Sequence, residues 1–212
     1  MIRYTYMFFR LFPVLRILFY KFWNRIYFLL LGIQYGRSLN VYNKVYIIGC
    51  GKIRIGNNFK FSSGDSLNAV SRNICGTMYT STSDAQIEIG DNVGISSACL
   101  WAKERIIIGN NVNVGADSIL IDNDAHPHLF NQRRVSHIKE VGKINYYNEI
   151  PSSPIIIDDD VWIGSRCHIL KGVHIGARSI VAAGSVVVKD IPADEVWGGN
   201  PAHFIKSLRH EE

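Results

Sequence analysis

The chain has 212 residues, of which 47% are hydrophobic and 19% charged, so it can bury a core and is not a disordered chain. Its formal net charge is +5, and every charged residue before Asp65 is basic, which indicates an anionic partner for the front end. The four cysteines lack the paired spacing of a zinc site or a disulfide framework, which favours a reducing, cytoplasmic location.

Residues 1–36 form a hydrophobic, basic segment that we predict to be helical. Its longest uncharged apolar run, from Ile26 to Ile33, is far shorter than the roughly 18 to 20 residues that cross a bilayer. Cations spread among aromatic residues are typical of a helix that lies in a membrane interface, at the inner face of the cytoplasmic membrane here. The alternative is a helix that packs on its own assembly or caps the domain that follows. Nucleic acid is a disfavoured partner, because these cations lie among aliphatic residues.

From Ile55 onward, aliphatic and aromatic residues recur with a period of six. A helix needs apolar returns at three and four residues and an amphipathic strand at two, so a period of six indicates stacked turns of a short repeated unit. Four residues after each position of the last run stands a second small or aliphatic residue, such as Cys167, which we predict to be a buried filler. The six-residue positions are Ile55 and Phe61; Ile89 and Ile95; Ile108, Val114 and Leu120; and Ile157, Ile163, Ile169, Ile175, Val181 and Val187.

The breaks in this period predict corners and loops. Gly56-Asn57-Asn58, Gly90-Asp91-Asn92 and Gly109-Asn110-Asn111 fit sharp corners, since Gly and Asn tolerate left-handed backbone angles. The polar stretch from Ser62 to Ser83 is predicted to be a loop. The longest break, residues 126–154, has no clear period, and a loop of this length inside a domain is usually functional.

Three local motifs resemble those of a known family. They are Ile121-Asp122-Asn123-Asp124-Ala125-His126-Pro127; Ile157 to Ser165, which contains Asp158-Asp159-Asp160-Val161-Trp162; and Ala183 to Pro192 followed by Gly198-Gly199-Asn200-Pro201-Ala202. In this order they resemble the hexapeptide-repeat acyltransferases, in the branch of the galactoside, maltose and polysaccharide O-acetyltransferases. The resemblance covers about residues 85 to 208. The front 60 residues lack the helical substrate domain expected of the galactoside and maltose enzymes, so the polysaccharide enzymes fit better.

The resemblance implies an all-β fold, a left-handed parallel β-helix of hexapeptide repeats, assembled as a homotrimer with active sites between subunits. The expected domains are the segment 1–36, the β-helix 37–205 with its extended active-site loop 126–154, and a tail 206–212. The expected activity is transfer of an acetyl group from acetyl-CoA to a sugar hydroxyl, in surface polysaccharide biosynthesis or on a precursor of such a polysaccharide.

The chemistry needs a base of near-neutral pKa for the hydroxyl proton, and histidine is the natural one. His126 occupies the position of the family's catalytic histidine, and His128 is the local rival. Asp122 or Asp124 would orient the imidazole as a carboxylate does in a triad, unless both cap a turn or contact sugar hydroxyls. Trp162 matches a tryptophan that lies beside the thioester end of the donor.

The resemblance also implies a donor site and an acceptor contact. Backbone groups of Ser165 and Ala183 would bind the pantetheine arm, and Lys189 would meet the nucleotide phosphates. Val188 stands where relatives often have threonine, and His203 and Lys206 stand where they have arginine. Ser96 aligns with a polar acceptor contact that is usually asparagine.

A metal site is not expected. His168 and His174, six residues apart, are predicted to stack on adjacent coils about 4.8 Å apart, but a carbonic anhydrase-like site needs three ligands and no third histidine has a matching spacing. Three alternatives stay open: an N-acetyltransferase acting on an amino sugar nucleotide, a metal-dependent hydratase of the carbonic anhydrase kind, and a non-catalytic membrane scaffold.

Overall fold

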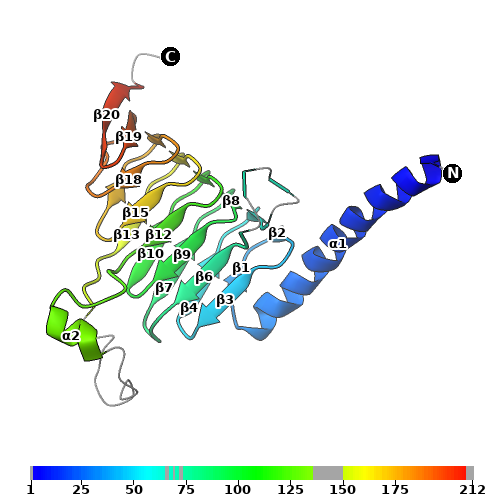
Figure 1. Ribbon diagram of the computed structural model, residues 1–212, viewed down its shortest axis with the longest axis horizontal. Helices are drawn as coiled ribbons and strands as arrows, with labels where there is room; N and C mark the ends of the chain where they lie inside the picture. Colours follow the sequence, from blue (N-terminus) through cyan, green and yellow to red (C-terminus); the bar gives the residue numbers. More distant parts are fainter. Residues whose placement is uncertain (1, 65–66, 69, 72–73, 136–149, 209–212) are drawn as a thin grey trace.

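The computed structural model describes residues 2–64, 67–68, 70–71, 74–135 and 150–208, with side chains of the first helix described from Val14 onward. The chain winds into a three-sided coil whose sides are parallel sheets, with a long helix at one end and a hairpin at the other (Figure 1). Each complete coil supplies one strand to each sheet in turn. This is the left-handed parallel β-helix expected from the sequence.

The three sheets are called A, B and C in the order in which the chain visits them. Sheet A contains β1 (Gln34–Tyr35), β4 (Lys52–Ile55), β7 (Gln86–Ile89), β10 (Arg105–Ile108), β13 (Ile155–Ile157) and β16 (His174–Ile175). Sheet B contains β2 (Asn40–Tyr42), β5 (Lys60–Ser62), β8 (Gly94–Ser96), β11 (Asn113–Val114), β14 (Trp162–Ile163), β17 (Ile180–Val181), β19 (Glu195–Gly199) and β20 (Ala202–Ser207). Sheet C contains β3 (Tyr46–Gly49), β6 (Thr77–Thr80), β9 (Cys99–Ala102), β12 (Ile119–Ile121), β15 (His168–Leu170) and β18 (Val186–Val187).

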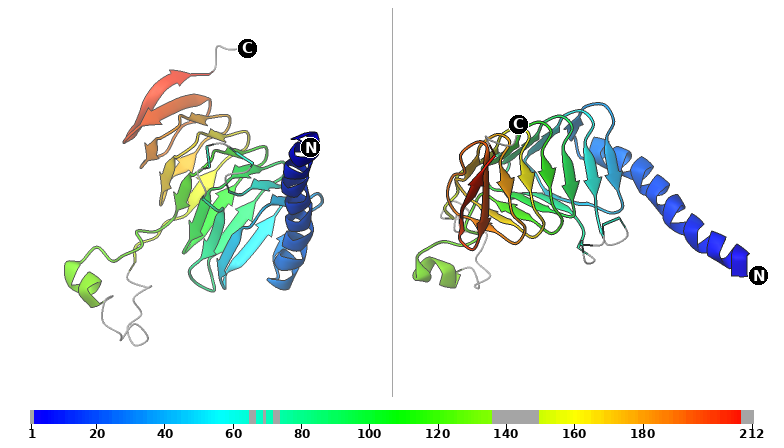
Figure 2. Two further views of the ribbon diagram at one scale, coloured as in Figure 1. Left: turned by 45° about the vertical axis from the view of Figure 1, so that its right-hand side comes forward. Right: turned by 90° about the horizontal axis from the view of Figure 1, so that it is seen from above.

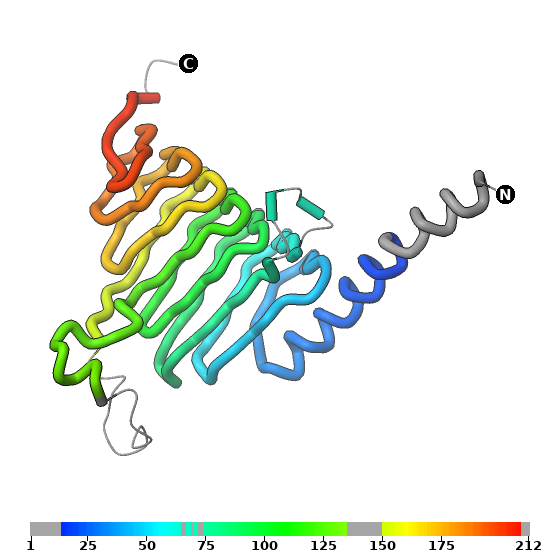
Figure 3. Tube along the Cα trace, viewed as in Figure 1, coloured from blue at the N-terminus to red at the C-terminus, as the bar shows by residue number. Residues whose placement is uncertain are grey.

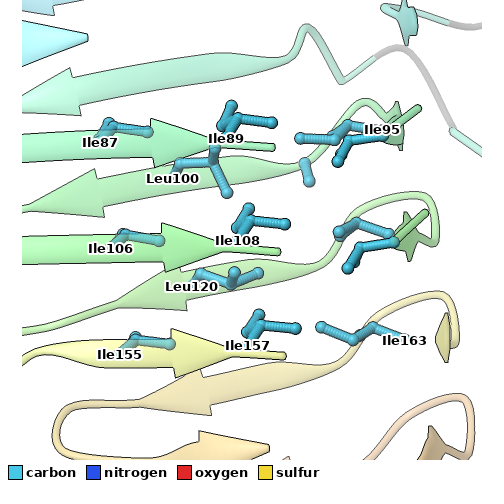
Figure 4. Close-up of a cluster of buried hydrophobic side chains, with 14 of the residues drawn as sticks. Ile87, Ile89, Ile95, Leu100, Ile106, Ile108, Leu120, Ile155, Ile157 and Ile163 are labelled. Carbon is cyan, nitrogen blue, oxygen red and sulfur yellow. The ribbon is translucent and has the colours of Figure 1, made fainter. Parts of the chain in front are cut away.

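The period of six corresponds to one side of the coil. Ile157 lies in sheet A, Ile163 in sheet B and Ile169 in sheet C, and all three side chains are buried. Figure 4 shows such residues of successive coils lying one above another along the axis of the core. The second position is also internal: Cys167 is fully buried as predicted, and this burial raises the pKa of its thiol.

The corners between sheets A and B carry a ladder of asparagine and aspartate. Asn58, Asn92 and Asn111 have φ values of 55°, 58° and 57°, which confirms the left-handed corners predicted for them. The Asp159 carboxylate accepts hydrogen bonds from the backbone N–H (2.6 Å) and the side-chain amide (3.2 Å) of Asn110. Asp91 receives the same pair of bonds from Asn57 in an earlier coil, at 2.6 and 3.1 Å. Successive coils are thus joined by polar side chains as well as by the sheets.

The N-terminal helix α1 (Ile2–Leu30) closes the first coil with its last turns. The Asn24 side chain is buried and donates to the carbonyls of Val41 (3.0 Å) and Asn43 (2.8 Å), and Phe28 is fully buried in the core. The helix ends before Gly32, whose φ of +69° lets the Ile33 N–H reach back to the Phe28 carbonyl at 3.0 Å. The sequence left open whether this helix packs on its own assembly or caps the following domain. The C-terminal end of α1 caps the coil.

The predicted domain boundaries need small corrections. The coil starts before residue 37, because Ile33 is already in the core and β1 begins at Gln34. At the other end β20 extends to Ser207, so residues 206 and 207 belong to the hairpin β19–β20 and not to a tail. The stretch from Ser62 to Ser83 is not one loop, since it contains β6.

Acid should weaken the ladder at the corners. Hydrogen bonds from the backbone and then the side chain of Asn110 hold the pKa of Asp159 below its ordinary value. A carboxylate whose pKa is lower in the folded than in the unfolded chain adds stability at pH values above the unfolded pKa, and this stability is lost as the pH falls through the folded pKa. We expect the free energy of unfolding to decrease as the pH falls below about 4, and to decrease less for Asp159→Asn.

Denaturant unfolding followed across the acid range measures this effect. Asp84→Asn, in the exposed turn before β7, is the matched control for the loss of one carboxylate. If the free energy of unfolding of Asp159→Asn fell with pH as steeply as that of the wild type, the stabilising role of the Asp159 carboxylate would be contradicted.

Candidate functional site

His126 lies just beyond the neck of the loop that leaves the coil between β12 and β13. The two chains of the neck are paired: the Ser153 N–H donates to the Asp122 carbonyl (2.9 Å), the Asp124 N–H donates to the Pro151 carbonyl (3.1 Å), and Asn123 and Ser152 form an antiparallel bridge. Beyond the neck, the helix α2 (Phe130–Val135) carries the chain outward (Figure 1). Residues 136–149 of the predicted active-site loop lie outside the described part of the chain.

The backbone holds the exposed His126 side chain at this neck. Ala125 has a φ of +58° and its N–H donates to the Asn123 side chain at 2.9 Å, which turns the chain so that the His126 N–H reaches the Asp124 carbonyl at 2.6 Å. Pro127 is buried, and its carbonyl accepts a bond of 3.1 Å from the Arg133 guanidinium on α2. The backbone on both sides of His126 is thus fixed while the residue remains exposed.

Asp122 has a structural role that differs from the orienting role predicted for it. Its carboxylate is fully buried and accepts the backbone N–H groups of Lys103 (2.7 Å), Glu104 (2.7 Å) and Arg105 (2.6 Å), which form the corner one coil earlier. The Asn123 side chain donates to the same carboxylate at 3.1 Å. With four donors Asp122 caps this corner, which was the alternative reading of the residue.

Asp124 contacts His128, the alternative candidate for the catalytic base. Its carboxylate lies 2.5 Å from Nε2 of His128 and 2.9 Å from the Lys171 ammonium, which comes from the same corner one coil later. Asp124 therefore bridges the loop to the coil beyond it. Lys171 was not among the predicted site residues; the pairs Leu120 with Ile169 and Ile121 with Leu170 place it in register with Asp122.

Ser96 and Trp162 lie together on the outer face of sheet B. They line an open depression of about 520 Å³, and Trp162, 55% exposed, forms part of its wall. The strand β11 lies between the strands of Ser96 and Trp162, and its Asn113 pairs with Gly94 on one side and with Trp162 on the other. The remaining described lining residues are Lys60, Ser62, Leu67, Asn68, Ile95, Val114 and Gly115.

The residues predicted to bind the donor fall into two groups. Ser165 and Ala183 lie on the corner between sheets B and C in successive coils, where the Gly184 N–H donates to the Ser165 carbonyl at 2.9 Å. This corner is tightly stacked, because a Cβ on Gly164 would lie 2.6 Å from the Ala183 nitrogen.

The second group lies at the C-terminal end of the coil. Val188 and Lys189 follow β18, and the Lys189 ammonium lies 5.0 Å from the ring centroid of Trp197 on β19. His203 and Lys206 are exposed on β20, which pairs with β19. Cations predicted to meet phosphates are therefore gathered around the terminal hairpin.

A single chain does not bring His126 and Trp162 together. His126 belongs to the connection from sheet C to sheet A, and in a three-sided coil that corner is opposite the third side, sheet B, which carries Trp162 and Ser96. Figure 2 shows the loop that carries α2 projecting from the coil. Next to the His126 corner, sheet C turns an apolar column outward. Its members pair in register across neighbouring strands, and they are Ile48, Tyr79, Trp101, Ile121 and Leu170.

The predicted stacking of two histidines is wrong. His168 lies in sheet C and His174 in sheet A, because six residues advance the chain by one side of the coil and not by one coil. His174 instead pairs with Asp158 of the preceding coil, with 3.0 Å between Nε2 and Oδ1. The described residues include no group of three or more His, Cys, Asp or Glu side chains placed to hold a metal ion.

Known proteins resemble this chain in sequence and in fold. The family model described as bacterial transferase hexapeptide (six repeats) matches residues 154–189, and that of the hexapeptide repeat of succinyl-transferase matches residues 105–121. The 2,3,4,5-tetrahydropyridine-2,6-dicarboxylate N-acetyltransferase of Clostridium perfringens is 59% identical over 61 residues, which are 28% of this chain and 26% of that enzyme. The match therefore spans about a quarter of that relative's length.

Two solved structures extend the comparison to most of the chain. A hexapeptide-repeat-containing acetyltransferase from Vibrio cholerae is 27% identical, with a TM-score of 0.53 over 84% of this chain and 74% of that one. The N-acyltransferase AntD from Bacillus cereus, solved as a point mutant with dTDP-4-amino-4,6-dideoxyglucose and coenzyme A, shares the fold at 18% identity, with a TM-score of 0.65 over 88% and 90% of the two chains. In its repeat, its coil and these matches, the chain resembles the hexapeptide-repeat acetyltransferases.

Proposed function

We propose that the protein transfers an acetyl group from acetyl-CoA to a hydroxyl of a sugar, with His126 as the general base. The observation that carries this proposal is the fixed backbone around an exposed imidazole in the His-Pro motif at the neck of the loop. The imidazole takes the proton of the acceptor hydroxyl while the hydroxyl oxygen attacks the thioester carbonyl. The tetrahedral intermediate then releases the coenzyme A thiolate, which recovers the proton from the imidazolium.

The chemistry of sheet B favours a hydroxyl acceptor over an amino group. The described lining of the depression offers Ser62, Asn68, Ser96 and Asn113 as hydrogen-bonding partners, one cation in Lys60 and no carboxylate. A carboxylate is the usual partner of an ammonium group, whereas hydroxyl and amide groups suit neutral sugars and a lysine suits acidic ones. The alternative acceptor, an amino sugar nucleotide, is supported by the N-acyltransferase neighbour with its amino sugar nucleotide and by the N-acetyltransferase relative.

We further propose that the active site forms between copies of the chain, as in a homotrimer. Two observations support this arrangement. His126 and the depression with Trp162 lie on opposite sides of one coil, and the outward apolar column of sheet C beside the His126 corner is a surface that a second copy would cover. The donor would then lie between the Ser165 and Ala183 corner and the cations of the terminal hairpin. The acceptor class that we favour is a sugar of a surface polysaccharide or of its precursor.

Replacing His126 tests the identity of the base. In assays with labelled acetyl-CoA, His126→Ala should lower kcat/KM for the acceptor by about 10² to 10⁴-fold, because the hydroxyl proton loses its acceptor. The matched control is His128→Ala, which keeps the proposed base and should cost less than about tenfold. A larger loss in His128→Ala than in His126→Ala would exchange the roles of the two histidines.

An acceptor panel tests the class of substrate. Matched sugars that carry either a free hydroxyl or an amino group at the same ring position are offered together with labelled acetyl-CoA. We expect label on the hydroxylated sugars, most strongly on acidic or neutral ones, because of the lining of the depression. If only the aminated sugars were labelled, the proposed O-acetyltransferase activity would be wrong and the protein would be an N-acetyltransferase.

Mixed assemblies test whether two copies share a site. His126→Ala and Trp162→Ala chains with different affinity tags are produced together, and assemblies that contain both are isolated. If each site takes His126 from one copy and Trp162 from the next in a trimer, every isolated mixed assembly regains one intact site, which is about one third of its sites. Assemblies of either variant alone are the controls and should be nearly inactive. Mixed assemblies as inactive as both controls would mean that each site uses residues of one chain.

A further inference from the structure

The helix α1 carries an apolar stripe that the coil does not cover. Leu15, Leu18, Phe19 and Phe22 follow the spacing of one helix face, while Asn24 and Phe28 pack on the coil. Figures 1 and 3 show α1 running away from the coil, so that only its last turns contact the first coil. The side chains of this surface are between 46% and 77% exposed, and we call them the α1 stripe: Val14, Leu15, Leu18, Phe19, Phe22, Trp23, Leu29 and Leu30.

Cations flank the α1 stripe. At 100° per residue, Arg25 lies near one margin, between Val14 and Leu18, and Arg16 lies at the other margin beyond Trp23. Lys21 follows Arg25 on the side toward the coil. Because the chain has no acidic residue before Asp65, the whole helix is positively charged. The α1 stripe therefore combines large exposed apolar side chains with flanking side chains that are all positively charged.

We propose that α1 lies in the plane of an anionic membrane surface and holds the coil there. The α1 stripe enters the boundary between headgroups and acyl chains, and Arg16, Lys21 and Arg25 contact lipid phosphates. Phe19 and Trp23, whose rings stack with 6.3 Å between centroids, supply the aromatic surface that suits this boundary. The contacts of Asn24 and Phe28 make the helix continuous with the coil, so the bound helix fixes the enzyme and not merely a tail.

Two other arrangements agree less well with these residues. Within the described part of the chain, no helix is both long and apolar enough to cross a bilayer. Pairing of the stripe with the same helix of a second copy would bring together chains with the same cations and no acidic residue in the helix. An anionic lipid surface satisfies both the apolar and the charged parts of the helix.

Vesicle flotation of the full chain tests the proposal. We expect the protein to float with phosphatidylcholine vesicles that contain phosphatidylglycerol, and to bind vesicles of phosphatidylcholine alone much more weakly. Leu18→Gln/Phe22→Gln should lower partitioning into the anionic vesicles by about tenfold or more. Arg16→Gln/Lys21→Gln/Arg25→Gln should lower it several-fold toward the level of the neutral vesicles and weaken its dependence on salt.

Controls separate membrane binding from folding and from oligomerisation. Val70→Gln/Ile74→Gln changes two exposed apolar side chains outside α1 and should leave vesicle binding unchanged. All variants should keep the wild-type circular dichroism and coenzyme A binding, because none of the altered residues is buried. Failure of the wild-type protein to bind anionic vesicles would overturn the proposal, as would a stripe variant that changes the oligomeric state without changing vesicle binding. Neither outcome depends on acetyl transfer.

Discussion

The stacking of coils through parallel backbone hydrogen bonds is the constraint on which the rest of this structure depends. Because each strand pairs in register with the strand one coil away, a residue's position within its coil fixes both the side on which it lies and the neighbours above and below it. The core is filled by the inward residues of each side, such as Ile155 and Ile157, so the corners and outer faces are free to vary. The site is accordingly built from corners and outer faces, and the core supplies rigidity.

The stacking of coils also keeps the two parts of the candidate site, His126 and the sheet B depression, apart within one chain. A loop that leaves the coil between sheets C and A cannot place its neck over sheet B of its own chain, so His126 and the depression beside Trp162 are held apart by the thickness of the coil. It also leaves both ends of the coil with unpaired strands, which need covers. The hairpin β19–β20 closes one end with Trp197, and the last turns of α1 close the other with Phe28. The rest of α1 then projects from the coil with its apolar stripe uncovered.

Much of the fold could be predicted from the sequence, because a period of six is visible wherever the inward residues are aliphatic. The period is not visible at β6, whose inward residues are Met78 and Thr80, so the sequence predicts a loop where the structure has a strand. The left-handed corners at the asparagines were predictable from local chemistry alone.

The site was predictable only in part. The motif singled out His126, but the role of Asp122 depends on backbone groups of Lys103 to Arg105, one coil earlier, and the pairing of Asp124 with Lys171 depends on the next coil. To predict contacts between coils, one must know how many residues each whole coil contains, including its insertions. The period of six gives only the length of one side. The same confusion of one side with one coil produced the wrong stacking of His168 on His174.

A crystal structure of the assembled protein with coenzyme A and an acceptor sugar would test the central claim most directly. We expect the sulfur of coenzyme A to lie between His126 of one copy and the sheet B depression of another, with Trp162 beside the sulfur. The central claim would be contradicted by a coenzyme A sulfur bound remote from His126, or by a site in which His126 and Trp162 of the same chain flank the acceptor.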